Sequence, residues 1–97
     1  TVDDCGRAVN PLILHGQTHG GIAAGVGQAL WENCHYDAES GQLLSASFMD
    51  YAMPRADQFP FFKTEISEIP SPTHLLGMRG GGEGGTDRQD GRAAAGA

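Results

Sequence analysis

The sequence is poor in the residue types on which several common protein classes depend. It contains 2 cysteines, and 6 lysines and arginines against 12 acidic residues, which gives a formal net charge of −6. Cys5 and Cys34 have no CxxC companion, so they predict neither a disulfide framework nor a zinc or redox motif, only ordinary, mostly buried thiols. Nucleic-acid binding depends on clustered lysine and arginine, so the scattered basic residues argue against a nucleic-acid partner.

Long hydrophobic runs are also absent. No apolar stretch approaches the ~20 residues that span a bilayer, and the segment Thr1 to Asp4 lacks the basic and apolar regions of a signal peptide. We therefore expect no membrane span, with the cytoplasm as the default location. The hydrophobic content of 39% is typical of a globular domain, and 97 residues predict one compact unit at most.

Glycine, by contrast, is abundant, with 15 residues or about twice its average usage. Asn10 as N-cap and Pro11 at the first helical position predict a long helix from Pro11 to about Asn33. Its expected face consists of residues three or four apart: Leu12, Gly16, His19, Ala23, Val26 and Leu30. Each internal glycine costs about 0.5–1 kcal/mol relative to alanine, so a flexible loop is the alternative. In a helix, these glycines would let another backbone or a large ligand approach closely.

The middle of the chain has the alternation that is typical of strands. Residues 35–37 and 42–51 flank a turn-like stretch that ends in Gly41, which predicts a β-hairpin. Residues 61–69 alternate in character and predict a further strand, which Pro70 ends. The expected fold class is therefore α+β, with one long glycine-rich helix packed on a small β-sheet.

A glycine-rich loop follows at residues 77–85 and carries only three other side chains, Met78, Arg79 and Glu83. Such a loop is either a flexible linker or a backbone held closely against a ligand. The final residues, 87–97, are polar and then low in complexity. We expect residues 1–86 to form the structured part, and residues 87–97 to be a disordered or non-native tail.

Six short motifs follow one another in a specific order along the chain. They are Asp4-Cys5-Gly6, Asn10-Pro11, the helical run from Gly16-Gln17 to Leu30, Asp50-Tyr51 with Pro54, Pro70-Ser71-Pro72, and Gly77-x-Arg79-Gly80-x-Gly82-Glu83. In this order the chain resembles the C-terminal part of the molybdopterin-binding large subunit of the xanthine dehydrogenase and carbon monoxide dehydrogenase family of molybdenum hydroxylases. The resemblance covers residues 1–86, whereas residues 87–97 depart from the family's alanine-rich helix.

The resemblance implies a molybdenum-dependent oxidoreductase that oxidises a small substrate with oxygen taken from water. The substrate would be an aldehyde, a purine, an N-heterocycle or carbon monoxide. The resemblance places the general base on Glu83 and cofactor contacts on Gln17, Gly81 and Gly82. The alternatives are a solvated glutamate in a flexible loop and a solvent-facing helix glutamine. The flanking glycines agree with the placement of the base, because they let a bulky cofactor approach the carboxylate.

The resemblance also implies partners and cofactors beyond this chain. The molybdenum–molybdopterin cofactor would be shared with the remainder of the large subunit, and partner modules would carry iron–sulfur clusters and FAD. The segment alone is expected to be inactive. His15 and His19 stand four residues apart, but no third ligand follows, so we expect no metal held by protein side chains. Arg79, where the family usually has lysine, is expected either to anchor an anionic group or to lie on the surface.

Two other classes of function compete with this interpretation. One is a small binding or assembly module that has the same fold without the chemistry. The other is a largely disordered glycine-rich polypeptide, against which the apolar content and the run through Phe61 and Phe62 argue.

Overall fold

The computed structural model describes residues 4–82, and its one α-helix in that range is α1 (Pro11–Leu30). The helix begins as predicted, because Pro11 lacks only an amide that would be unpaired at a helix start. Asn10 occupies the N-cap with an extended backbone, although its side chain makes no cap hydrogen bond. The helix ends at Leu30 instead of Asn33, where the amide of Trp31 donates to the carbonyl of Gly27 over 3.0 Å. The flexible-loop alternative for this range is therefore wrong.

The expected β-sheet is not present in the described residues. Apart from α1, they contain the short 3-10 helix η1 (Ala56–Gln58) and three isolated bridges, Asp4 with Ser67, Gly6 with Met78, and Tyr36 with Leu43. The predicted turn does form, since the amide of Asp37 donates to the carbonyl of Gln42 over 2.8 Å. A β-ladder needs a partner strand along its whole length, and an isolated two-stranded hairpin is only marginally stable in water. The α+β prediction is thus wrong for the sheet and correct for the helix.

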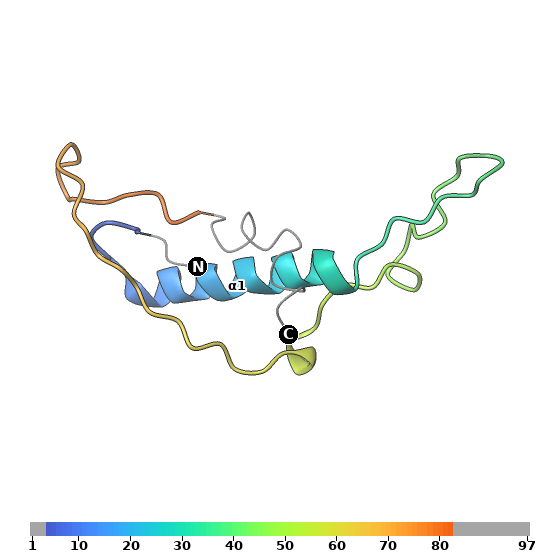
Figure 1. Cartoon of the computed structure of the whole chain (residues 1–97), viewed down its shortest axis with the longest axis horizontal. Coiled ribbons are helices and arrows are strands. Elements are labelled where there is room, and N and C mark those ends of the chain that lie inside the picture. Colours follow the sequence, from blue (N-terminus) through green and yellow to red (C-terminus); the bar gives the residue numbers. More distant parts are fainter. Residues whose placement is uncertain (1–3, 83–97) are drawn as a thin grey trace.

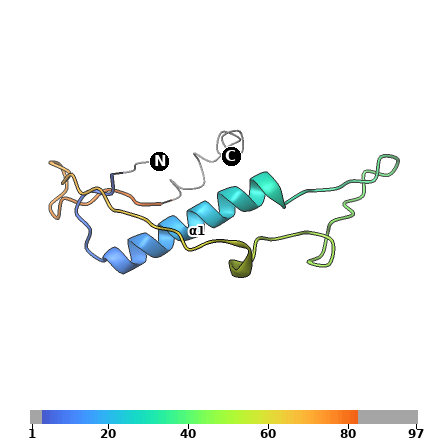
Figure 2. The ribbon, with the colours of Figure 1, turned by 60° about the horizontal axis from the view of Figure 1, so that its bottom comes forward.

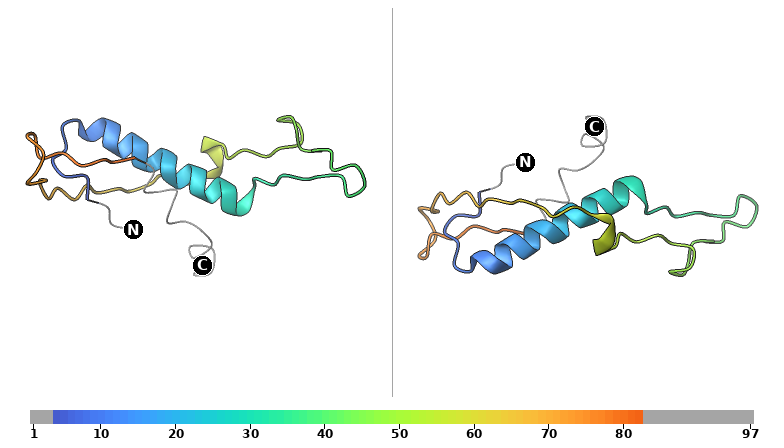
Figure 3. Two further views of the ribbon diagram at one scale, coloured as in Figure 1. Left: turned by 90° about the horizontal axis from the view of Figure 1, so that it is seen from above. Right: turned by 90° about the horizontal axis from the view of Figure 1, so that it is seen from below.

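The chain is wrapped lengthwise around α1 (Figures 1 and 2). Residues 31–55 form an arm that extends beyond the C-terminal end of the helix and returns to η1. Residues 59–69 then run back along α1 to its N-terminal end, and residues 70–82 turn there and run along it again (Figure 3). The result is an elongated body with principal extents of 56 × 28 × 24 Å.

A histidine–threonine cluster attaches residues 59–69, the returning segment, to α1. Thr64 Oγ1 lies 2.7 Å from His15 Nδ1 and 3.2 Å from His19 Nε2. Because a hydroxyl both donates and accepts, it can satisfy the two imidazoles together. The ring of His19 also packs edge-on against Phe61 and Phe62, with centroids 6.1 and 5.7 Å away. These two histidines are therefore engaged in packing the segment onto the helix.

No hydrophobic side chain between residues 4 and 82 is buried. The chain exposes 7540 Å² of surface, whereas a compact protein of this mass would expose roughly 5,300 Å². Large side chains on several elements face solvent, among them Leu12, Phe48, Phe61 and Leu75. The described residues therefore have no hydrophobic core of their own. The two cysteines, which were expected to be mostly buried, are less so: Cys5 is half-buried and Cys34 is exposed, and both are free thiols.

Across the described range, no helix has the length and hydropathy needed to cross a bilayer.

Two glycines of α1 are expected to respond oppositely to alanine. A Cβ on Gly27 would lie 2.6 Å from Pro54 Cγ, whereas a Cβ on Gly20 would meet nothing within 4 Å. Gly20→Ala should therefore stabilise the helix of this chain by about 0.5–1 kcal/mol, because alanine favours a helix more than glycine does. Gly27→Ala should show no such stabilisation, because its new Cβ would have to displace Pro54. Helix content from circular dichroism measures both. Equal gains for the two variants would contradict the packing of Pro54 on α1.

Candidate functional site

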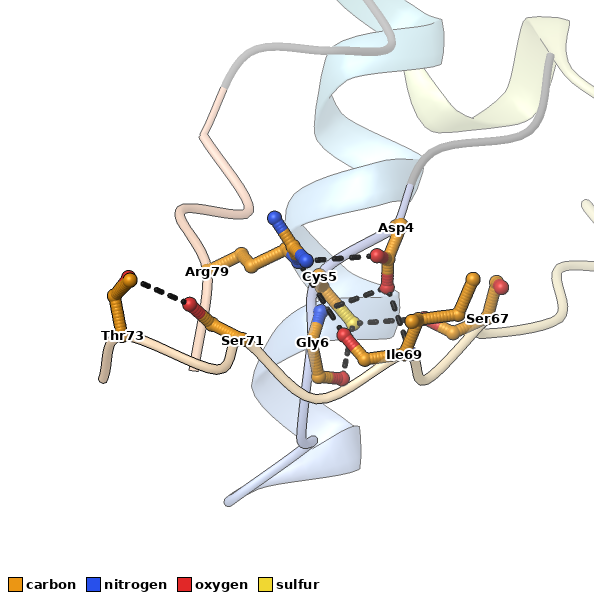
Figure 4. Close-up of polar contacts among 8 residues, drawn as sticks. All are labelled: Asp4, Cys5, Gly6, Ser67, Ile69, Ser71, Thr73 and Arg79. Carbon is orange, nitrogen blue, oxygen red and sulfur yellow. Dashed lines mark hydrogen bonds and ion pairs between the residues drawn. The ribbon is translucent and has the colours of Figure 1, made fainter. Parts of the chain in front are cut away.

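Three segments meet beside the N-terminal half of α1, and we call residues 4–7, 67–71 and 77–79 the three-segment junction (Figure 4). Backbone hydrogen bonds hold it together. The amide of Arg79 donates to the carbonyl of Cys5 over 3.0 Å, and the carbonyl of Gly77 accepts from Arg7 at 2.9 Å and from Ser71 at 3.0 Å. The junction thereby fixes where the chain enters the glycine-rich loop.

Asp4 is the polar centre of the junction. Its Oδ1 accepts from the amides of Gly6 and Ile69, each over 2.9 Å, and its Oδ2 lies 3.1 Å from Arg79 Nε. The same Nε donates to the carbonyl of Ile69 over 3.3 Å. Arg79 therefore pairs with the Asp4 carboxylate of this chain while it lies at the surface, which was the second of the two expected positions.

The charge of Asp4 is favoured by its surroundings. The amide of Ile69 and then that of Gly6 lower the pKa of Asp4 below its usual value. Desolvation opposes them less strongly, and the charge of Arg79 contributes the weakest lowering effect. A lowered pKa in the folded state means that the stabilisation is complete above the unfolded value. It is lost only as the pH falls through the lowered value. The ion pair is accordingly present throughout the neutral range.

Gly6 permits the close contact of the first and third segments. Its φ is +64°, a conformation that residues with a side chain rarely adopt, and a Cβ there would collide with the carbonyl oxygen of Gly77. The same Cβ would lie 2.9 Å from the amide nitrogen of Arg79. Only glycine therefore fits this position without moving the junction.

The described part of the glycine-rich loop contacts α1 at Leu14. A Cβ on Gly81 would lie 2.9 Å from Leu14 Cδ2, so the loop backbone is packed directly on this helix side chain. Leu14 and Gln17 are three residues apart and are therefore neighbours on the helix surface. The structure thus packs Gly81 on Leu14, whereas a Cβ on Gly82 would meet nothing within 4 Å.

The side chain of Gln17 is exposed, and its amide makes no hydrogen bond to any residue between 4 and 82. An unpaired amide offers both a donor and an acceptor to a ligand. No group of three or more histidine, cysteine, aspartate or glutamate side chains in the described range could hold a metal ion. The described residues therefore offer hydrogen-bonding groups and bare glycine backbone, which fits a large organic cofactor.

Two predicted features lie outside the described residues, namely Glu83 and the tail at 87–97. The sequence interpretation missed two others, Asp4 and Thr64. Asp4 had a local signal, because an aspartate two residues before a glycine is typical of an Asx-turn, and Oδ1 does accept from the amide of Gly6. The sequence around Thr64 carries no local signal for its role, because its histidine partners are 49 and 45 residues away.

Comparisons with known proteins point to one family. The profile of the molybdopterin cofactor-binding domain matches residues 1–60. The carbon monoxide dehydrogenase large chain of Afipia carboxidovorans is 43% identical over 82 residues, which cover 84% of this chain and 10% of that protein. The nicotine 6-hydroxylase large subunit of Paenarthrobacter nicotinovorans is 41% identical over 85 residues, or 88% of this chain and 10% of the relative. The chain thus spans about a tenth of the length of the curated relatives it matches.

Two solved structures resemble this chain in backbone conformation as well as in sequence. Quinoline 2-oxidoreductase from Pseudomonas putida 86 matches with a TM-score of 0.80 and 41% identity, over 88% of this chain and 11% of that chain. A Cu,Mo-CO dehydrogenase matches with a TM-score of 0.78 and 41% identity over the same shares. The elongated, coreless conformation is therefore the one that the matching segment adopts within much longer chains.

Proposed function

The chain belongs to the molybdopterin cofactor-binding domain family of the molybdenum hydroxylases, and from this we propose that it forms one wall of the cofactor site in a large subunit. The whole enzyme would be a molybdenum-dependent oxidoreductase that oxidises an aldehyde, a purine, an N-heterocycle or carbon monoxide with oxygen taken from water. The observation that supports this most is the packing of the Gly81 backbone on Leu14 of α1, three residues before Gln17, whose exposed side-chain amide has no hydrogen-bond partner among residues 4–82.

Each of the proposed site residues would have a separate role. The Gln17 amide would orient the cofactor by a hydrogen bond. The open backbone at Gly82 would admit the bulk of the pterin, and Gly81 would contact it from the side opposite Leu14. When bound, the cofactor supplies the metal centre that takes up the electrons of the substrate. Glu83 follows Gly82 directly in sequence, and its carboxylate would accept the proton that the attacking water-derived oxygen loses.

The remainder of the large subunit would cover the apolar side chains that this chain leaves exposed, such as Leu12 and Phe48. Residues 1–86 would belong to the cofactor domain and residues 87–97 would be a tail outside it. Modules that carry iron–sulfur clusters and FAD would receive the electrons.

Gln17→Ala in the assembled large subunit tests the cofactor contact. The loss of one hydrogen bond, worth about 0.5–1.5 kcal/mol, should weaken cofactor retention by about 2- to 13-fold. The molybdenum and pterin content of the purified enzyme under limiting cofactor measures the effect. Gln28→Ala is the matched control, because Gln28 is also an exposed glutamine of α1. Equal content in the two variants would remove Gln17 from the cofactor site.

A further inference from the structure

We propose that Leu14 is a positioning residue that holds the glycine-rich loop at a fixed distance from α1 through its contact with Gly81. This inference rests on the proposed function, since the loop and α1 are assigned there to one wall of the cofactor site. Leu14 is not offered as a catalytic residue, because it would act only through the backbone of Gly81.

Residues 80–82 cannot define their own path, because all three are glycine. Glycine has more backbone freedom than any other residue and no side chain with which to make a contact. The amide of Arg79, directly before them, is held by its hydrogen bond to the carbonyl of Cys5. Beyond that bond, the position of the loop depends on what its backbone rests against.

Leu14 supplies this support. A Cβ on Gly81 would lie 2.9 Å from Leu14 Cδ2 and 3.9 Å from Cys5 Cβ. A Cβ on Gly80 or Gly82 would meet no described residue within 4 Å. Gly81 is therefore the one of the three glycines whose side-chain direction is closed within residues 4–82, and Leu14 makes the closer of the two contacts.

The place of Leu14 on the helix connects this support to the proposed cofactor contacts. Leu14 lies three residues before Gln17 on α1, so the two side chains are neighbours on the helix surface. The size of the Leu14 side chain thus sets the spacing between the Gln17 amide and the loop backbone. A ligand that touches both is bound more tightly when that spacing exists before it arrives.

The contact can be altered at Gly81 without straining the backbone. The φ of Gly81 is not positive, in contrast to the values at Gly6, Gly41 and Gly77. A methyl group added to Gly81 therefore meets the steric limit set by Leu14 and no conformational penalty of the left-handed region. Volume can accordingly be removed from Leu14 and added to Gly81.

The test is this exchange of volume in the assembled large subunit, measured as the molybdenum and pterin content under limiting cofactor. Leu14→Ala should weaken cofactor retention by roughly 5- to 30-fold, the cost of ordering about one more backbone residue on binding. Gly81→Ala should also lower retention, because its methyl group pushes the loop away from Leu14. In the Leu14→Ala background the methyl group fills the gap, so Gly81→Ala should there raise retention by at least about twofold.

Gly80→Ala is the matched control, because its Cβ would contact no described residue. It should change retention by the same factor with and without the Leu14 side chain. Normal retention in Leu14→Ala, or no rise in retention when Gly81→Ala is added to it, would overturn the positioning role. A wild-type subunit that holds no molybdopterin would instead overturn the proposed function.

Discussion

Replacing Glu83 with glutamine is expected to lower the turnover number of the cofactor-loaded enzyme by about 100- to 10,000-fold. Glutamine keeps the size of the side chain and much of its hydrogen bonding but removes the basic oxygen. A positioned general base typically contributes a factor of this size. Because the substitution should not disturb the pterin, molybdenum content and the visible spectrum of the enzyme should be retained. Steady-state kcat on active-site-normalised enzyme is the measurement.

The control for this experiment is Glu65→Gln, which neutralises an exposed glutamate of residues 59–69 that lies outside the three-segment junction. It should leave kcat unchanged. A Glu83→Gln enzyme with full cofactor and near-normal turnover would refute the assignment of the base, and the glycine-rich loop would then be purely structural.

Replacing Gly6 with alanine should have the largest effect on stability, about 2–4 kcal/mol in the free energy of unfolding. A non-glycine residue in the left-handed region costs about 1–2 kcal/mol. The new Cβ must also push away the Gly77 carbonyl, which accepts two hydrogen bonds of the junction worth about 1 kcal/mol each. The midpoint of urea unfolding of the large subunit measures the loss.

Gly41→Ala provides a matched comparison, because Gly41 has a φ of +71° but open space around its Cβ position. It should cost only the backbone strain, about 1–2 kcal/mol. If Gly6→Ala costs no more than Gly41→Ala, the close contact between Gly6 and Gly77 does not contribute to the stability of the junction.

The sequence predicted the start of α1 well because its determinants are local. Asn10 and Pro11 occupy the N-cap and first helical positions, where a proline costs no hydrogen bond. The end was less predictable, since no glycine or proline follows Leu30 directly and residues 31–33 have no strong helical or non-helical preference.

The alternation in residues 61–66 was interpreted correctly as a pattern and incorrectly as a strand. Phe62, Thr64 and Ile66 are half-buried while Phe61, Lys63 and Glu65 are exposed, so the two faces are as predicted. The half-buried face packs on α1 through Thr64 and Phe62, and residues 4–82 contain no neighbouring strand with which it could form a ladder. Burial that alternates from residue to residue shows which side of a segment is covered. It does not show whether a strand or a helix covers that side.

The candidate site was predictable only where the motifs are local. Gln17 and the glycine-rich loop were found from short motifs, whereas the packing of Gly81 on Leu14 joins residues far apart in the chain. The ion pair of Asp4 with Arg79 is equally non-local, and no pattern in a single sequence pairs two such charges. Its discovery required the folded junction.

The most direct test of this account is an experimental structure of the large subunit that contains this chain, with molybdopterin bound. The account predicts that the Glu83 carboxylate lies within hydrogen-bond reach, about 2.6–3.2 Å or through one water, of a ligand on molybdenum. It also predicts the Gln17 amide in contact with the cofactor and Arg79 still paired with Asp4. A structure in which Glu83 faces bulk solvent, while other segments of the subunit hold the cofactor, would contradict the central claim.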